Sequence, residues 1–510
     1  MLAEVESAAI VGMDCYKVQV EIDISQGLPA FNIVGLPDTA IQESRERVRS
    51  GTSNSEYKFP MRRITVNLAP ADIRKEGPAF DLPIAVGIII ASEQLKTEVN
   101  DYLIIGELSL TGEVRKVKGT LPIAIFARDK GKKGVIVPSE NAAEAALVEE
   151  IEVISVNSLK ETIDFIKGAM IIEAISQDHN HRFQEANHYD DDFSDVKGQY
   201  HVKRALEVAA AGGHNILMIG PPGSGKTMLA RRLPSILPAM DIEEVLEVTK
   251  IYSVAGMLSK ESSLVAVRPF RSPHHTISCA GLAGGGQNPR PGEISLSHNG
   301  VLFLDEFPEF QKNALQVLRQ PLEDGSVTIS RALNSLTYPA RFTLVAAMNP
   351  CPCGYVGDKL KECTCTPNRI QQYRTKISGP LLDRIDIHVE VPRLAKQELI
   401  SIKNTEPSAE IRTRVQKARD QQRARFSDHA AITCNTHMRP EQVKRFCKLT
   451  DSAKEFLEKA IDNLGLSARS YDRVLKVSRT IADLRESDII DLADLAEAVQ
   501  YRSLDRNMLH

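Results

Sequence analysis

Apolar and polar positions follow two different periods in the first third of the chain. "YKVQVEIDIS" and "RITVNLAP" alternate apolar and polar residues and are rich in β-branched side chains, which predicts strands. "DLPIAVGIIIASEQL" predicts a buried helix, and "KKGVIVPSENAAEAALV" predicts a strand, a turn and a helix. Residues 1–172 are therefore expected to form an α/β domain. The polar, aperiodic residues 173–191 are expected to be a linker.

The pattern changes twice more. Residues 192–395 contain very apolar runs, "NILMIG", "GVLFLDE" and "RFTLVAAMNP", between helical segments. Strands that are apolar on both faces are typical of a parallel sheet covered by helices. Residues 396–510 show only the 3.6-residue period, as in "PSAEIRTRVQKARDQQRARF", which predicts a helical lid.

Composition adds little to this picture. The chain has 510 residues, 42% hydrophobic and 25% charged, with a net charge of -4. That charge does not indicate a nucleic-acid protein, although a ring-shaped motor can hold a basic channel within a neutral whole. The sequence contains no apolar run of membrane-spanning length and no signal peptide, so we expect a cytoplasmic location without a membrane partner. Cysteines stay reduced there, so clustered ones indicate metal binding or catalysis.

The stretch "GPPGSGKT" predicts a nucleotide site because it follows an apolar strand and precedes a helix. Its glycines allow backbone N–H groups to converge on phosphate. We expect Lys226 to reach the β- and γ-phosphates of ATP and Thr227 to ligate Mg²⁺. The predicted contacts are Gly220, Pro221, Pro222, Gly223, Ser224, Gly225, Lys226 and Thr227.

Two later strands end in residues that complete such a site. "GVLFLDE" delivers Asp305, expected in the Mg²⁺ shell, and Glu306, expected to act as the general base. "TLVAAMNP" places Asn349 where an amide can orient water. Arg384 is either a surface ion pair or an arginine finger for a neighbouring subunit. Arg469 is the expected nucleotide sensor in the lid, with Arg473 as its competitor.

Four cysteines lie close together as two C-x-C pairs in "NPCPCGYVGDKLKECTCTPNR". Cys351, Cys353, Cys363 and Cys365 fit a closed tetrahedral Zn²⁺ site, and four free thiols are the alternative. Few apolar residues lie between the pairs, so metal would supply folding energy. We expect a structural zinc knuckle over residues 351–365.

These motifs, in this order, resemble the AAA+ ATPases of the magnesium-chelatase-like branch. "RPFRSPHHT", "NPRPGEISLSHNGVLFLDE" and "GPLLDRIDIHVEVP" resemble the ComM/YifB family over essentially the whole chain. The resemblance implies a homo-hexameric ring that migrates DNA branches during natural transformation, with recombination proteins as partners. It also implies a channel insertion between Thr276 and Ile294 and a hairpin before Asn349. Arg290 and Arg331 are the expected contacts to DNA phosphates, or merely solvated charges, and we expect the glycine-rich insertion to be a mobile loop.

The N-terminal domain resembles the protease domain of Lon in "KEGPAFDLPIAVGIIIAS" and "GELSLTGEVRKVKGTLPIAIFARDKGKKGVIVPSEN". Ala79 and Leu121 stand where Lon proteases carry their nucleophilic serine and lysine, so we expect no proteolysis. Lys75, Arg115, Lys116 and Lys118 are candidates for a docking or DNA-guiding surface, or are solvated charges.

The sequence therefore predicts an ATP-driven DNA motor that uses ATP, Mg²⁺ and structural zinc. A metal-insertion motor like the true magnesium chelatases is the first alternative, and a nucleotide-gated scaffold or protein-remodelling ATPase is another. A Lon-like peptidase is disfavoured by Ala79.

Overall fold

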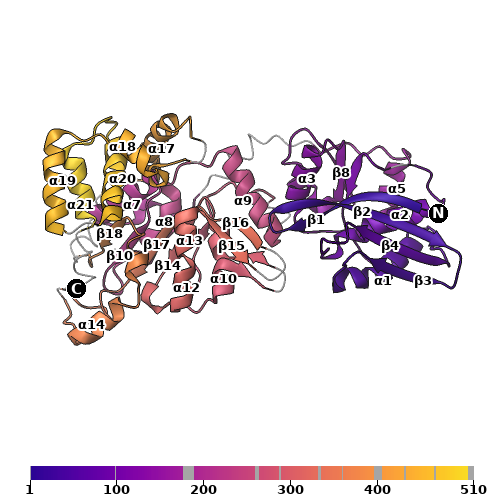
Figure 1. Ribbon diagram of the computed structural model, residues 1–510, viewed down its shortest axis with the longest axis horizontal. Helices are drawn as coiled ribbons and strands as arrows, with labels where there is room; N and C mark the ends of the chain where they lie inside the picture. Colours follow the sequence, from indigo (N-terminus) through magenta and orange to yellow (C-terminus); the bar gives the residue numbers. More distant parts are fainter. Residues whose placement is uncertain are drawn as a thin grey trace. The chain divides into compact units, whose positions relative to one another are not determined.

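The computed structural model describes most of the chain as two compact units. The described residues are 2–97, 99–175, 189–258, 263–286, 289–330, 335–358, 360–394, 405–429, 432–464 and 467–502. The first unit comprises Met1–Ala186, Ile242–Ala266 and Ser330–Thr337, and the second comprises Asn187–Asp241, Val267–Ile329 and Tyr338–His510 (Figure 1). The predicted linker lies mostly outside the described residues. In the described ranges no helix combines the length and apolar character of a membrane span.

The first unit is built on a mixed four-stranded sheet with the order β1-β2-β4-β3. Its strands are β1 (Leu2–Val11), β2 (Asp14–Ser25), β3 (Ala30–Val34) and β4 (Arg63–Ala69). Neighbouring strands are antiparallel except β3 and β4, which are parallel. Val18, Val20 and Ile22 of β2 are fully buried at every second position, so the predicted alternation is confirmed.

Helices and two smaller sheets complete this unit. Its remaining elements are α1 (Thr39–Asn54), η1 (Pro78–Phe80), α2 (Asp81–Ala91), β5 (Tyr102–Ile104), β6 (Glu107–Leu108), β7 (Val114–Arg115), α3 (Thr120–Asp129), β8 (Gly134–Pro138), α4 (Ser139–Ala145), β9 (Glu152–Val156) and α5 (Leu159–Ile166). Strands β5, β8 and β9 form a parallel sheet, and β6 pairs with β7. Nearly every residue of α2 is buried, which confirms the predicted buried helix.

One helix of the first unit comes from a distant part of the sequence. Helix α9 (Ile242–Ala255) packs on α3. The hydroxyl of Ser253 donates to Glu144 Oε1 at 2.5 Å, and its carbonyl accepts from the Gly119 N–H at 3.2 Å. The Lys116 ammonium donates to the Leu258 carbonyl at 2.6 Å. The segment Ile242–Ala266 is therefore held in the first unit by specific polar contacts.

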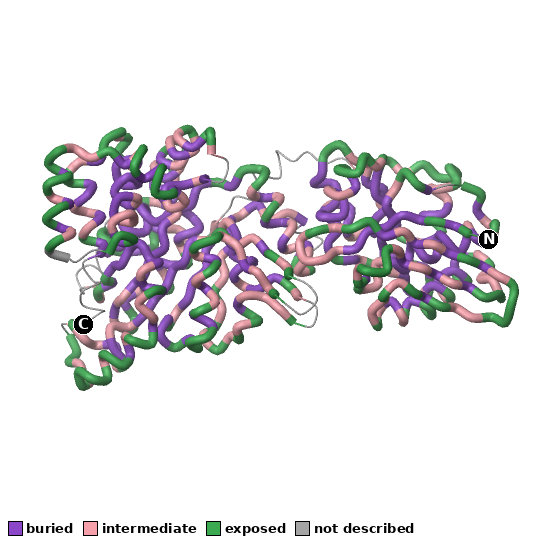
Figure 2. Tube along the Cα trace, in the orientation of Figure 1, coloured by how far each residue is buried: buried purple, intermediate pink, exposed green. Residues whose placement is uncertain are grey.

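The second unit contains a five-stranded parallel sheet with the order β11-β14-β17-β10-β18. The strands are β10 (Ile216–Ile219), β11 (Phe270–Arg271), β14 (Val301–Leu304), β17 (Thr343–Met348) and β18 (Ile387–Glu390). Leu302 and Leu304 face one apolar core, and Val301 and Phe303 face the other. Both faces of the sheet are thus buried (Figure 2), as the apolar runs predicted.

Helices cover the two faces. Elements before and around the strands are η2 (Phe193–Asp195), α7 (Tyr200–Gly212), α8 (Lys226–Ile236), α10 (Cys279–Ala283), α11 (Glu293–Leu296), η3 (Phe307–Glu309), α12 (Lys312–Val317), α13 (Arg319–Asp324), α14 (Pro367–Arg374) and α15 (Gly379–Leu382). The predicted helical C-terminal part is confirmed as α17 (Ser408–Arg425), η4 (Asn435–His437), α18 (Pro440–Phe446), α19 (Asp451–Leu464), α20 (Ala468–Leu484) and α21 (Leu492–Gln500). It packs on α7 and α8 through α17 and α20.

Two small ribbons lie where the sequence placed an insertion and a hairpin. Strands β15 (Ser326–Ser330) and β16 (Ser335–Pro339) form the expected hairpin. The insertion contains α10 and an antiparallel ribbon of β12 (Gly284–Gly285) and β13 (Arg290–Pro291). The prediction of a loop without core residues is wrong for α10, because Leu282 is fully buried and the Ser278 hydroxyl caps the helix.

Candidate active site and metal centre

The phosphate loop joins β10 to α8, and its glycines are required by the backbone. Gly223 and Gly225 have φ values of 75° and 91°, which other residues rarely adopt. At Gly220 a Cβ atom would lie 2.2 Å from the Val391 carbonyl oxygen. The loop therefore has the shape that the motif predicted, with backbone N–H groups at the N-terminus of α8.

Lys226 is buried within this loop. Its ammonium donates to the carbonyls of Gly220 at 2.7 Å and Pro221 at 3.0 Å, and to Asn349 Oδ1 at 3.3 Å. Burial lowers the pKa of Lys226, and the negative charge of Asp305 partly offsets that shift. The three oxygens that accept hydrogen bonds from Lys226 are all uncharged. An anionic phosphate would accept a stronger hydrogen bond from this ammonium than they do.

The Mg²⁺ residues predicted from separate motifs are in contact. Thr227 Oγ1 donates to Asp305 Oδ2 at 2.7 Å, and the other oxygen of Asp305 accepts from the Glu306 N–H at 2.9 Å. A hydroxyl and a carboxylate side by side are the hard oxygen ligands that Mg²⁺ prefers, so these residues fit that ion. Thr227 and Asp305 would hold this metal, which would neutralise negative charge that develops on the phosphate during hydrolysis.

Glu306 has a neighbour that the sequence prediction did not include. His275 Nδ1 lies 3.1 Å from Glu306 Oε2, and the His275 ring lies against His274, with 4.1 Å between the ring centroids. The signal was present in "RPFRSPHHT", in which the two histidines follow β11. The candidate general base therefore has an imidazole partner from the strand beside its own.

Strand order explains why these residues meet. Because β17 lies between β10 and β14, Asn349 at the carboxyl end of β17 comes between the phosphate loop and the acidic pair. The carboxyl ends of adjacent parallel strands form one edge of the sheet, where α/β proteins bind ligands. Lys226, Thr227, Asp305 and Asn349 are thus brought into one connected cluster.

The two arginines predicted to act in catalysis share a different partner. Arg384 pairs with Glu323 of α13 and donates to the Pro380 carbonyl at 2.5 Å. Arg469, whose side chain is 62% exposed, lies 3.8 Å from the same Glu323 oxygen. In the described part of the chain, neither guanidinium has a hydrogen bond to the phosphate loop. Both are gathered at one carboxylate instead.

Arg473, the competitor of Arg469, is engaged in the protein interior. Its guanidinium donates to Asp386 at 3.1 Å, and His214 lies 3.5 Å from the same carboxylate. Burial disfavours the charged form of Asp386, but Arg473, His214 and Lys476 outweigh burial and hold its pKa well below the usual range. This position suits a structural role for Arg473.

The four predicted cysteines come together. Cys351 Sγ lies 3.3 Å from Cys353 Sγ and 3.7 Å from Cys363 Sγ, and Cys353 Sγ lies 3.5 Å from Cys363 Sγ. The ligand atoms of all four, including Cys365, lie within 4.8 Å of one another. Tetrahedral Zn–S bonds of about 2.3 Å separate the sulfurs by roughly 3.8 Å, so the cluster fits a structural zinc ion.

Local hydrogen bonds favour a thiolate in this cluster. Burial disfavours ionisation of Cys353, but hydrogen bonds from the Tyr355 and Thr364 backbones and from Cys351 and Cys365 outweigh it. Together they lower the pKa of Cys353 to about 5. The Cys365 backbone lowers the pKa of Cys363, but burial and hydrogen bonds with Cys353 and Cys351 outweigh it and raise that pKa to about 12; the pKa of Cys365 is also raised. One thiolate therefore lies beside protonated thiols, and zinc, which thiolates coordinate, would release their protons on binding.

The residues proposed for DNA are placed unequally. Arg290 lies exposed on the short ribbon of β12 and β13, whereas Arg331 lies outside the described residues. The prediction that Lys75 lies on an exposed surface of the N-terminal domain is wrong. Lys75 is fully buried, and its ammonium donates to the Pro70 carbonyl. Burial lowers the pKa of Lys75, so it belongs to the interior and not to a docking surface.

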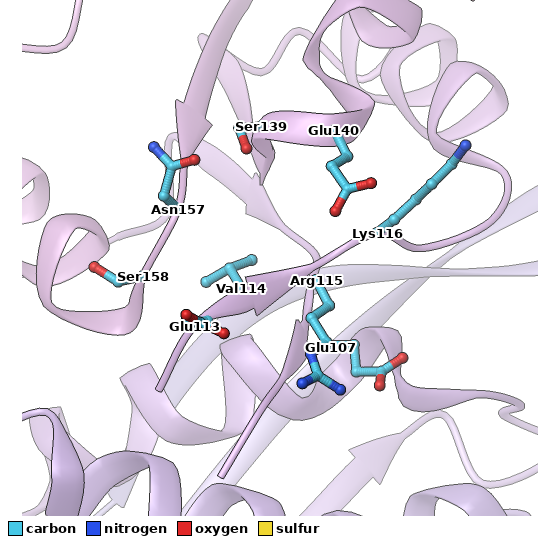
Figure 3. A pocket seen from close by; sticks show the side chains of 9 residues that line it. All are labelled: Glu107, Glu113, Val114, Arg115, Lys116, Ser139, Glu140, Asn157 and Ser158. Carbon is cyan, nitrogen blue, oxygen red and sulfur yellow. The ribbon is translucent and has the colours of Figure 1, made fainter. Parts of the chain in front are cut away.

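Arg115 and Lys116 line a cavity of about 740 Å³ in the first unit (Figure 3). Three carboxylates share its wall, so it does not present a uniformly basic surface for nucleic acid. The Lys116 ammonium is engaged by the Leu258 carbonyl. The full lining is Glu107, Glu113, Val114, Arg115, Lys116, Ser139, Glu140, Asn157 and Ser158.

The parallel sheet, its phosphate loop and the residues at its carboxyl edge define a P-loop ATPase of the AAA+ class. Family models agree: "Magnesium chelatase, subunit ChlI" matches residues 192–399, "Subunit ChlI of Mg-chelatase" matches residues 20–141, and the ChlI C-terminal model matches residues 405–502. The chain belongs to the ComM/YifB family of magnesium-chelatase-like AAA+ ATPases, which implies ATP and Mg²⁺ as ligands.

Relatives of nearly equal length support this assignment. Competence protein ComM of Haemophilus influenzae is 45% identical over 99% of this chain and 98% of its own length. YifB of Escherichia coli, whose function its name leaves open, is 43% identical over 100% of this chain and 98% of its own length.

Two further relatives match only part of the chain. Lon protease 2 of Bacillus subtilis matches 29% of this chain and 30% of its own length at 27% identity. The DNA replication licensing factor mcm6 of Dictyostelium discoideum matches 37% of this chain and 18% of its own length at 24% identity.

Proposed function

We propose that this protein is an ATP-driven, homo-hexameric DNA motor that moves a DNA branch point during recombination or natural transformation. One observation carries the proposal: Arg384 and Arg469 meet at Glu323, while Lys226, Thr227 and Asp305 form a separate cluster around the phosphate loop. In the described residues neither Arg384 nor Arg469 is bonded to the phosphate loop of its own chain, so this site is suited to receive such an arginine from the next subunit. Nucleotide would then bind where adjoining copies meet.

Within one such site each residue has a separate role. Lys226 and the loop N–H groups bind phosphate, and Thr227 with Asp305 holds the metal. Glu306 accepts the proton of the attacking water, and Asn349 orients that water. Arg384 of the adjoining copy, steadied by Glu323, stabilises the charge that develops on the transferred phosphate. Arg469, beside it, senses the nucleotide.

DNA is the proposed cargo. Arg290 is exposed on a ribbon of the ATPase unit, and phosphate contacts from such arginines give salt-dependent binding without sequence preference. The names of two relatives, a competence protein and a DNA replication licensing factor, point the same way. We extend the proposal to Arg331 and to recombination proteins as partners in the cytoplasm.

The test is unwinding of forked and three-stranded DNA by the purified protein with ATP. We expect the wild-type protein to separate the strands. The Lys226→Ala variant should neither separate strands nor hydrolyse ATP. Arg290→Ala should weaken DNA binding and lower its salt dependence, while Lys312→Ala, an exposed cation on α12, serves as the control. Wild-type hydrolysis that ignores DNA would refute the proposal.

A metal-insertion motor is the second candidate, favoured by the chelatase description of the matching family models. DNA-independent hydrolysis that is stimulated by a chelatase partner would support it. The DNA-stimulated ATPase assay therefore separates the two candidates.

A further inference from the structure

The cysteine knuckle touches the phosphate loop directly. Gly354, which directly follows Cys353, adopts a φ of 85°, and a Cβ atom there would lie 2.6 Å from Pro222 Cδ. Asn349, at the start of the same segment, accepts from Lys226 at 3.3 Å. The cysteine knuckle and the phosphate loop are therefore in contact within the second unit.

A single side chain joins the two features. Arg393 donates from Nη2 to the Pro222 carbonyl at 3.3 Å, and its Nε lies 3.1 Å from Asp358 Oδ2 in the knuckle. Its guanidinium also lies over the Tyr355 ring, 5.4 Å from the centroid. The Asp358 side chain is only 3% exposed, whereas that of Arg393 is 31% exposed, so the carboxylate is buried and its partner is partly open to solvent.

The backbone around Arg393 holds the loop from its other side. Val391 donates its N–H to the Ile219 carbonyl at 2.7 Å, just before the loop begins. The Gln199 amide donates to the Ser224 carbonyl at 2.7 Å and to the Pro392 carbonyl at 3.2 Å. The phosphate loop is thus fixed between the segment after β18 and the knuckle.

We propose that the cysteine knuckle is a buttress of the phosphate loop, and that Arg393 and Asp358 are positioning residues for nucleotide binding. The inference rests on the proposed ATP site and on zinc at the four cysteines. The knuckle has little apolar material of its own, so metal fixes the backbone that carries Asp358. Asp358 in turn aims Arg393 at Pro222, which keeps the loop N–H groups pre-organised for phosphate.

The test measures the Kd of a fluorescent ADP analogue on the full-length protein, which requires no hydrolysis and no DNA. Arg393→Ala and Asp358→Asn should each raise this Kd about tenfold, the loss of one charge-assisted contact. Lys361→Ala is the matched control, because Lys361 lies 4.2 Å from the same Tyr355 ring but is exposed. We expect that control to bind like wild type.

A second arm uses the metal. Zinc is removed with a chelator, its content and the melting temperature are measured, and the Kd is determined before and after zinc is returned. We expect affinity to fall on removal and to recover on return, while Asp358→Asn keeps the zinc content of wild type. Wild-type affinity in both variants, or in the metal-free protein, would overturn the buttress.

The two proposals fail differently. A wild-type protein that binds the ADP analogue but hydrolyses ATP without regard to DNA refutes the motor and leaves the buttress intact. Normal DNA-stimulated unwinding together with unchanged affinity in both variants refutes only the buttress.

Discussion

Replacing Arg473 with alanine tests whether that residue is structural, as its position indicates. The change removes one of the cations around buried Asp386 and leaves His214 at 3.5 Å and the Asn215 N–H at 3.2 Å. Loss of one partner of a buried ion pair costs about 3–5 kcal/mol, and the remaining contacts favour the lower value. For a unit of this size, about 3 kcal/mol corresponds to a decrease in melting temperature of about 5 °C.

The pH dependence provides a second readout. The folded-state pKa of Asp386 is depressed below its unfolded value of about 3.9. Its stabilisation is therefore present above that unfolded value and is lost as pH falls through the folded one. The difference between wild type and variant should be constant at neutral pH and shrink in acid.

The assay is thermal unfolding followed by circular dichroism between pH 2 and pH 8, with Arg469→Ala as the matched control. The Arg469 side chain is exposed, so its removal should change the free energy of unfolding by less than about 0.5 kcal/mol while lowering ATP hydrolysis. Equal stability of Arg473→Ala and wild type, with hydrolysis lost, would refute the reasoning and make Arg473 the sensor.

Three further predictions concern the site. Glu306→Gln should bind ATP with wild-type affinity but hydrolyse it at least about 100-fold more slowly, measured by phosphate release, because the general base is lost; a normal rate would remove Glu306 from that role. Glu323→Gln should lower kcat and leave the nucleotide Kd unchanged, since Arg384 and Arg469 lose their shared partner; a changed Kd with normal kcat would contradict this. Cys363→Ser should lose bound zinc in metal analysis, whereas full zinc occupancy would show that the other ligands suffice.

Local sequence predicted the elements of the site because each depends on near neighbours. The strand, glycine loop and helix around Lys226 form a contiguous unit, and the apolar strands that end at Asp305 and Asn349 are recognisable one at a time. The clustering of the four cysteines followed from their spacing. The general expectation that these strands form one parallel sheet followed from their apolar character on both faces.

Other features could not be read from the chain in this way. Glu323 and Arg469 are far apart in sequence, as are Pro222 and Arg393, and nothing local marks either pair. Lys75 is surrounded by polar residues in the sequence, yet it is buried because the fold gives its ammonium a carbonyl acceptor. Helix α9 belongs to the first unit although its neighbours in sequence belong to the second.

The sequence by itself determined the class of protein, the nucleotide loop, the acidic pair and the thiol cluster, because short-range spacing sets backbone geometry and side-chain chemistry there. Only the tertiary structure decided that Arg473 pairs with buried Asp386, that Arg384 and Arg469 share Glu323, and that the knuckle lies against Pro222. Those outcomes depend on strand order and on contacts between distant segments, whose free energies arise only when the whole sheet and its covering helices have assembled.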